Sequence, residues 1–435
     1  MEHFENVCMQ VNSCSLSGVA AFFAGIPKAG IVLNSPLWCY YNVLKQIEID
    51  GNTAEQIFCT HLDNTSLIYG TEEYLLETLQ SVKKECAEDI TVLCIENSCA
   101  VTLIGDDIAA IAKKAGFSCP IICLDSGGLK GDFWDGYQFA VDAYFSQVKT
   151  GGKKKKIPRT VNLLGYSVTY QNYYNDLVEL KNLLAVMGYQ VLTCPGCGSS
   201  VEKMQHIGQA ELNIVLHEEL GLSLAKTLQN DYGTPYLNCL LPYGIVGTLK
   251  WLQAIQNFFV LDKQIEFQRI EQMAATYKEK IEKRLQKLRD IWGELRFYNV
   301  VVSAPVSIAL AVAKAIKEEW AECANVYVVL QDGNKNSALM AEGLIVIDGK
   351  NDSIRIQTIL EDLAGGLLVG CSNERALLLQ ANIKSVVCQN ICSPNYDEVL
   401  LSESPYMGFQ GASFLLENLW NKYIEMKKLE RLGGL

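Results

Sequence analysis

Positive charge, histidine and long apolar runs are all scarce in this sequence. Lys and Arg number 37 against 49 Asp and Glu, and the net charge of −12 argues against nucleic acid or an anionic membrane surface as a partner. The longest apolar run, 300–313, is broken by Ser303, Pro305 and Ser307 and is too short to span a bilayer. Residues 1–6 are polar and acidic, unlike a targeting signal. We therefore expect a soluble, cytoplasmic protein with no membrane partner.

Nucleotide-binding motifs are absent as well. No Gly-x-Gly-x-x-Gly follows the first expected strand and no Walker-type lysine loop is present, so we do not expect the chain to hold its own NAD or ATP. Three of the four histidines, His3, His61 and His206, stand in no recognisable catalytic arrangement. Nothing therefore supports a Cys-His hydrolase.

Cysteine is unusually frequent. The chain of 435 residues has 16 cysteines, and its hydrophobic content of 49% provides a large core without disulfides. In a reducing compartment these thiols are core residues, metal ligands or reactive groups. Cys94 and Cys123, inside apolar runs, fit the core.

Short β-branched runs alternate with amphipathic stretches from end to end. We expect strands at 31–33, 91–95, 121–124, 161–164, 190–193, 212–216, 236–241, 300–302, 326–330, 344–347, 367–369 and 385–387, and helices between them, such as 106–115 and 176–187. This alternation predicts an α/β fold with parallel sheets flanked by helices.

Two segments divide the expected fold. A glycine-then-lysine stretch at 150–158 is typical of a linker, and the charged segment 262–296 has apolar residues at helical spacing. We therefore predict three Rossmann-like domains, at 1–152, 158–260 and 297–435, with a bridging helix at 261–296.

Cysteine and histidine recur where the expected strands end, which is where such sheets bind ligands. Cys39 and Cys99 follow the strands at 31–33 and 91–95, Cys194 and Cys197 follow 190–193, His217 follows 212–216, and Cys371 follows 367–369.

Three of these cysteines have distinctive settings. Cys14 lies in Asn-Ser-Cys-Ser-Leu-Ser-Gly, Cys39 ends Asn-Ser-Pro-Leu-Trp-Cys, and Cys99 begins Cys-Ala-Val-Thr-Leu-Ile-Gly-Asp-Asp. Their order, spacing and settings resemble the nitrogenase component 1 family, which includes the nitrogenase molybdenum–iron protein α and β subunits, cofactor-assembly scaffold subunits and the dark-operative protochlorophyllide reductase. Segments 63–74, 211–215 and 404–412 also look like family landmarks, so the resemblance spans all three expected domains.

The resemblance implies that Cys14, Cys39 and Cys99 are metal ligands. They would hold an iron–sulfur cluster, [4Fe-4S] or a larger P-cluster-like cluster, which in the family lies at a subunit interface. Three cysteines cannot complete a four-ligand cluster, so the remaining ligands must come from a partner chain, another side chain such as Ser or Asp, or the sulfides of the cluster itself. The implied partners are a second copy of the chain or a homologous subunit, a separate ATP-hydrolysing iron–sulfur reductase protein, and a small-molecule substrate.

The sequence also departs from the family. Where catalytic nitrogenase holds its large cofactor with a cysteine and a histidine, our alignment has His217 and Glu398, and a bulky Trp38 stands beside Cys39. Dinitrogen reduction is therefore not expected. The interpretations that remain are an electron-accepting reductase subunit, a scaffold for assembling a complex metal cluster, or a binding protein that has lost its clusters.

A second group of residues is predicted for the cleft between domains. We expect Cys194, Cys197, His217 and Cys371 to line one cavity there, with Glu398 as a further cofactor-binding residue. Cys194 and Cys197 could be a redox pair, two unpaired thiols or part of a second metal centre. His217 is the candidate for proton transfer. Cys239, Cys388 and Cys392 are held in reserve as lining residues.

Overall fold

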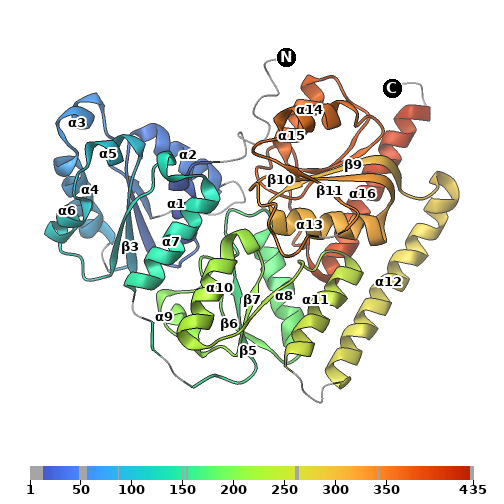
Figure 1. Ribbon diagram of the computed structural model, residues 1–435, viewed down its shortest axis with the longest axis horizontal. Coiled ribbons are helices and arrows are strands. Elements are labelled where there is room, and N and C mark those ends of the chain that lie inside the picture. The colour runs from blue at the N-terminus through green and yellow to red at the C-terminus, as the bar shows by residue number, and fades with distance from the viewer. Residues whose placement is uncertain are drawn as a thin grey trace.

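The computed structural model describes residues 13–48, 56–86, 88–148, 150–152, 155–259, 264–340 and 342–431. Its strands form three separate sheets in which every pairing is parallel, and helices flank each sheet (Figure 1). The predicted α/β fold class is confirmed. The sheets use strands from 29–125, 160–238 and 296–390.

The first sheet has the order β2-β1-β3-β4. Its strands are β1 (Ala29–Asn34), β2 (Ile57–Cys59), β3 (Val92–Asn97) and β4 (Ile121–Asp125), and the helices are α1 (Ser15–Ala24), α2 (Leu37–Ile47), α3 (Asn64–Tyr69), α4 (Glu72–Cys86), α5 (Cys99–Ile104), α6 (Ile108–Ala115), η2 (Gly128–Lys130) and α7 (Phe133–Gln147). One face packs against α1 and α7 and the other against α4 and α6. Because both faces are covered, β1 and β3 are buried along their whole length.

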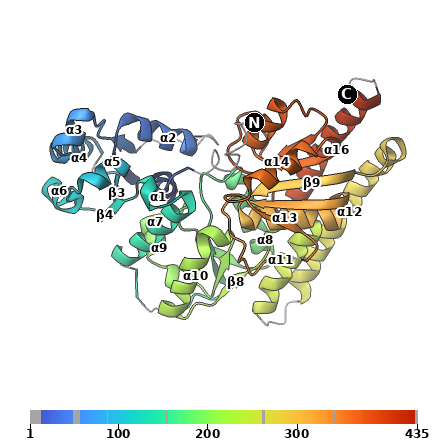
Figure 2. The ribbon, with the colours of Figure 1, turned by 45° about the horizontal axis from the view of Figure 1, so that its top comes forward.

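The second sheet has the order β6-β5-β7-β8. It consists of β5 (Thr160–Leu164), β6 (Gln190–Thr193), β7 (Leu212–Val215) and β8 (Tyr236–Asn238), with α8 (Tyr173–Val186), α9 (Val201–Met204), η3 (Ile207–Gln209), α10 (Glu218–Tyr232) and α11 (Gly244–Phe258). The long helix α12 (Gln264–Trp292) follows and runs along the outside of the molecule from the second sheet toward the third (Figures 1 and 2).

The third sheet has the order β11-β10-β9-β12-β13. It contains β9 (Arg296–Ala304), β10 (Glu322–Leu330), β11 (Ile345–Asp348), β12 (Leu367–Gly370) and β13 (Val387–Asn390), with α13 (Val306–Ala315), η4 (Ile316–Trp320), α14 (Ser353–Glu361), α15 (Ser372–Gln380) and α16 (Gly408–Arg431). The central strand β9 is a Val-rich run buried from Asn299 to Ala304. Among the described residues, no helix combines the length and apolarity needed to cross a bilayer.

The final helix joins two of the sheets. α16 packs against β13 and also against α8, α11 and α12. Its start is held by Asp176 of α8, whose carboxylate accepts hydrogen bonds from the backbone N–H groups of Tyr406 (2.6 Å) and Met407 (2.8 Å). The second and third parts of the chain therefore form a continuous body around α16.

Candidate functional site

The three cysteines of the first sheet lie at the beginnings of helices. Cys14 directly precedes α1, Cys39 lies in the first turn of α2, and Cys99 is the first residue of α5. Because α2 and α5 follow the parallel strands β1 and β3, Cys39 and Cys99 lie near the same edge of the sheet. Cys14 is held near this edge by a backbone bridge to Asp132, the residue that caps α7.

Two glycines make room between these cysteines. A methyl group on Gly128 would lie 3.0 Å from Cys14 Cβ, 3.6 Å from Cys99 Sγ and 4.0 Å from Cys14 Sγ. One on Gly127 would lie 2.4 Å from the backbone nitrogen of Cys99. The backbone N–H of Gly128 donates a hydrogen bond to Cys99 Sγ at 2.9 Å. The thiols of Cys14 and Cys99 therefore border a space that glycine alone leaves open.

The Ile-Gly-Asp-Asp motif supports the segment that carries Cys99. Gly105 ends α5 with a φ of +82°, which favours glycine. Asp106 accepts hydrogen bonds from the backbone N–H and the hydroxyl of Thr71, both at 2.7 Å, and Asp107 caps α6. The hydroxyl of Thr71 also accepts from Asn34 at the end of β1. The motif thus connects the segment after β3 to Thr71, which precedes α4, and through Thr71 to the end of β1.

The electrostatics of the three thiols are coupled. Burial is the main cause that raises the pKa of Cys14, and the neighbouring Cys99 raises it further. Burial likewise raises the pKa of Cys39, with added contributions from Cys14 and Cys99. A thiol in this setting keeps its proton until a cation compensates the charge of the thiolate.

The residue types at this site suit an iron–sulfur cluster. No group of three or more His, Cys, Asp or Glu within the described ranges is arranged to hold one metal ion. Soft sulfur donors, the N–H donated to Cys99 and the open space at Gly128 suit an iron–sulfur cluster.

Large apolar side chains are exposed on the segments that carry these cysteines. Trp38 beside Cys39 is 83% exposed and Leu103 on α5 is 76% exposed, and Leu129 on η2 and Tyr41 on α2 are also exposed. We call Trp38, Tyr41, Leu103 and Leu129 the apolar rim. Large exposed apolar side chains on the segments that surround a site are typical of a surface that another protein covers.

The second predicted group is buried in the core. Cys194, Cys197, His217 and Cys371 are each 0–2% exposed. Cys194 and Cys197 pack against each other, whereas Cys371 donates to Glu374 Oε2 at 2.7 Å. One shared cavity at these residues, and a second metal centre there, stay predictions.

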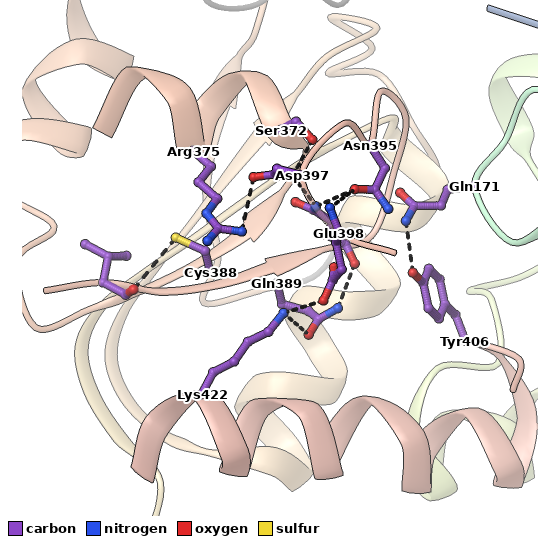
Figure 3. A network of polar contacts seen from close by, with 12 residues as sticks. Gln171, Ser372, Arg375, Cys388, Gln389, Asn395, Asp397, Glu398, Tyr406 and Lys422 are labelled. Atoms are coloured by element: carbon purple, nitrogen blue, oxygen red, sulfur yellow. Dashed lines mark hydrogen bonds and ion pairs between the residues drawn. The ribbon is translucent and has the colours of Figure 1, made fainter. Parts of the chain in front are cut away.

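Glu398 lies in a different environment, in a polar network beside α16 (Figure 3). Its Oε1 accepts a hydrogen bond from Lys422 Nζ at 2.8 Å, and Lys422 also donates to Gln389 at 3.1 Å. The adjacent Asp397 is bound by Ser372 and Arg375. Glu398 does not line the cavity described next, and its cofactor-binding role stays a prediction.

A cavity of about 100 Å³ does lie where the three parts of the chain meet. The first part contributes Ser13, Gln46, Phe133 and Trp134, the second Thr169, Tyr170 and Gln171, and the third Pro305, Ile308, Gln331, Cys392, Ser393, Pro394 and Tyr396. Cys392 was among the residues held in reserve, whereas Tyr170 and Gln171 were not predicted. Both residues lie in the loop after β5. Ligands bind at the carboxyl ends of parallel strands, but the sequence analysis considered only Cys and His at these positions and therefore missed Tyr170 and Gln171.

His217 reaches this cavity indirectly. Its ring packs against Tyr166 and Tyr170 at centroid distances of 4.9 and 4.7 Å, and its Nδ1 lies 3.6 Å from Glu219 Oε1. The same carboxylate accepts a hydrogen bond from the hydroxyl of Tyr170 at 3.1 Å, and that hydroxyl accepts one from Trp134 Nε1 at 3.2 Å. Tyr170 therefore connects the buried His217–Glu219 pair to the cavity.

Comparison with known proteins decides the family. Residues 14–424 match the nitrogenase component 1 type oxidoreductase family. The chain belongs to this family. The match covers all three cysteines of the candidate site and the cavity residues from Gln46 to Tyr396.

Relatives within the family have different roles. The chain is 23% identical to a subunit of the light-independent protochlorophyllide reductase of Synechococcus sp. (strain JA-3-3Ab), over 93% of this chain and 81% of that protein. It is 23% identical to the nitrogenase iron-molybdenum cofactor biosynthesis protein NifE of Methanococcus maripaludis, over 92% and 80%. The solved structure "Nitrogenase Cp1 at pH 5" matches with a TM-score of 0.76 and 19% identity, over 96% of this chain and 89% of that one, and supports the fold alone.

Proposed function

We propose that this family member is the electron-accepting subunit of a two-component, ATP-dependent reductase. Cys14, Cys39 and Cys99 would hold its iron–sulfur cluster. The observation that carries the proposal is that Cys14 and Cys99 lie beside Gly128 and Cys39 lies close enough to both to interact electrostatically, in a chain from a family of oxidoreductases. A cluster bound there would take up and pass on single electrons. Dinitrogen is not the proposed substrate, because His217 is buried where the alignment expects a cofactor-holding cysteine.

The apolar rim supports a subunit interface at this site. Trp38 and Leu103 flank two of the three cysteines and expose most of their surface. A second chain covering them would remove apolar surface from water and could supply the ligands that three cysteines leave missing. The proposed partner is a second copy of this chain or a homologous subunit.

The interdomain cavity is the proposed substrate site. Reduction consumes protons as well as electrons, and Tyr170 lines the cavity while its hydroxyl donates a hydrogen bond to Glu219. Glu219 in turn contacts His217 and accepts a hydrogen bond from Ser307 Oγ at 2.6 Å. We assign Tyr170 as the group that passes protons to the substrate, and His217 as a positioning residue behind it.

The alternative is a scaffold that builds and hands on a metal cluster. Similarity to NifE of Methanococcus maripaludis favours it. Such a cargo needs several soft or charged ligands, and Cys392 is the one cysteine among the described residues that line the cavity. We therefore prefer the reductase.

Anaerobic purification followed by iron and sulfide analysis tests the proposal. Cys14→Ala, Cys39→Ala and Cys99→Ala should each lose most of the iron and weaken subunit association, because each removes a ligand of the cluster. Cys119→Ala is the matched control, since Cys119 is also half-buried but packs against the opposite core of the first domain. Full iron content in the three variants would exclude the assigned ligands.

A further inference from the structure

Two cysteines follow neighbouring strands of the third sheet. β12 and β13 pair in parallel through Gly370 and Asn390, Cys371 directly follows β12, and Cys392 lies two residues beyond β13. The backbone N–H groups of Ile391 (2.8 Å) and Cys392 (3.4 Å) both donate to the carbonyl oxygen of Gly370, so the two segments stay together past the end of the sheet. Adjacent strands lie about 4.8 Å apart, and a disulfide spans Cα separations of about 4.4–6.8 Å. The backbone therefore brings Cys371 and Cys392 within the reach of a disulfide.

The two thiols also share their polar neighbours. Cys371 Sγ donates a hydrogen bond to Glu374 Oε2 at 2.7 Å. Gln331 Nε2 donates to Oε1 of the same carboxylate at 3.2 Å and to Cys392 Sγ at 3.7 Å. The side chains of Cys371 and Cys392 contact each other as well. All four side chains are at most 4% exposed, so the two sulfurs lie together inside the protein.

Only one of the two sulfurs has access to the interdomain cavity. Cys392 is among the residues that line this cavity of about 100 Å³, and Cys371 is not. Tyr396, which is 55% exposed, lines it too, so the cavity opens to the surface. A space of this volume holds a few molecules of the size of water and excludes a tripeptide. A small reagent can therefore reach Cys392, whereas a bulky one cannot.

The surroundings give the two thiols different parts in a reaction. Burial, with the adjacent Cys392 and Glu374, raises the pKa of Cys371, so this thiol keeps its proton. Cys392 meets a reagent in the cavity first. Cys371 stands behind it, with the carboxylate of Glu374 at hand to accept a proton.

We propose that Cys392 and Cys371 form a peroxide-reactive pair, which hydrogen peroxide entering the cavity converts to a disulfide. In the first step the sulfur of Cys392 attacks one oxygen of the peroxide, the O–O bond breaks, and a sulfenic acid and one water form. In the second step the sulfur of Cys371 attacks the sulfenic sulfur. Its proton passes to Glu374 and then to the departing hydroxide, which leaves as water. Two thiols and one peroxide thus give one disulfide and two waters, and two electrons pass from the sulfurs to the peroxide.

Oxidation of this pair alters the wall of the cavity. Ser393 and Pro394 follow Cys392 and also line the cavity, while Cys371 directly precedes α15. A disulfide joins these two segments covalently and removes the hydrogen bond from Cys371 to Glu374. The pair therefore makes the shape of the cavity sensitive to peroxide. The inference does not depend on the proposed function, since neither step uses a cluster or a reductase.

Mass spectrometry of oxidised protein tests the proposal. The purified full-length chain is treated with hydrogen peroxide or with glutathione disulfide, free thiols are alkylated in denaturant, and linked peptides are identified after digestion. Peroxide should join the peptides of Cys371 and Cys392 with the loss of two hydrogens, and glutathione disulfide should not, because it is too large for the cavity. Oxidation at the proposed cluster ligands appears in other peptides and does not enter the result.

Cys194 and Cys197 are the internal control. They also contact each other and are 1–2% exposed, but neither lines the cavity, so they should stay reduced at a peroxide concentration that links the proposed pair. The absence of a link between Cys371 and Cys392, an equal yield with glutathione disulfide, or equal oxidation of Cys194 and Cys197 overturns the proposal. This comparison is made on the wild-type chain and needs no variant to fold.

Three variants test the order of the two steps. Cys371→Ser should accumulate the sulfenic acid at Cys392, where dimedone captures it, and Cys392→Ser should leave Cys371 unmodified. Cys388→Ser is the matched control. Cys388 stands in the same tryptic peptide as Cys392 but bonds to the carbonyl oxygen of Val386 at 3.8 Å, so its loss should not affect the link (Figure 3). Sulfenic acid at Cys371 in Cys392→Ser, or loss of the link in Cys388→Ser, contradicts the assignment.

Discussion

Gly128→Ala is the sharpest perturbation of the candidate cluster site, because it adds one methyl group between two of the proposed ligands. That methyl would lie 3.0 Å from Cys14 Cβ and 3.6 Å from Cys99 Sγ, in the space that the cluster needs. Without a cluster, Cys14 Cβ and the backbone that carries it must shift by a few tenths of an ångström. The cost is then offset by the roughly 0.4–1 kcal/mol that a Gly→Ala change contributes through the unfolded chain. The melting temperature of the cluster-free protein should therefore change little.

With the cluster bound, the same methyl overpacks the site. Overpacking typically costs about 1–3 kcal/mol, which corresponds to cluster binding weakened by roughly five- to 150-fold. The assay is anaerobic reconstitution with iron and sulfide, followed by metal analysis and electron paramagnetic resonance. Gly247→Ala is the control, since its methyl would meet no atom closer than 3.8 Å and lies far along the chain on α11. Wild-type iron content and an unchanged spectrum in Gly128→Ala would refute the site.

Three further predictions concern the nucleotide, a buried acid and the apolar rim. The chain alone should not bind ATP, because it has no phosphate-binding loop; tight binding in calorimetry would count against the two-component function. Burial and the neighbouring Glu219 raise the pKa of Asp332 from 3.8 to about 8, so the folded state holds this proton more tightly and stability falls as pH rises from about 4 to 8. The free energy of unfolding of Asp332→Asn should equal that of the wild type near pH 4 and exceed it by about 1–3 kcal/mol at pH 8, a range reduced because Asp332 keeps some contact with water. If the stability of both proteins changes equally with pH in thermal unfolding, this prediction is wrong. Trp38→Ser with Leu103→Ser should weaken subunit association at least tenfold in analytical ultracentrifugation while leaving the melting temperature of the single chain within a few degrees, and an unchanged dissociation constant would place the interface elsewhere.

Local sequence patterns predicted most of the secondary structure. The strands expected at 190–193 and 121–124 are β6 (Gln190–Thr193) and β4 (Ile121–Asp125), because β-branched runs between turn residues fit buried parallel strands. β2 (Ile57–Cys59) was missed, since three residues at a sheet edge carry too little pattern to detect. The group Cys14, Cys39 and Cys99 was recognisable because each setting is a short local motif.

The tertiary structure alone decided what the interdomain region contains. The sequence placed Cys194, His217 and Cys371 near the carboxyl ends of strands. That prediction concerned the position of each residue along the backbone and not the surroundings of its side chain. Whether their side chains reach a cavity depends on the segments that pack over them, and these bury all three. The cavity is formed instead by Trp134, Gln171 and other residues from three distant parts of the chain. The spacing of apolar residues indicates which face of each segment is buried. It does not indicate which other segments cover that face, because those contacts form only when the three sheets pack together.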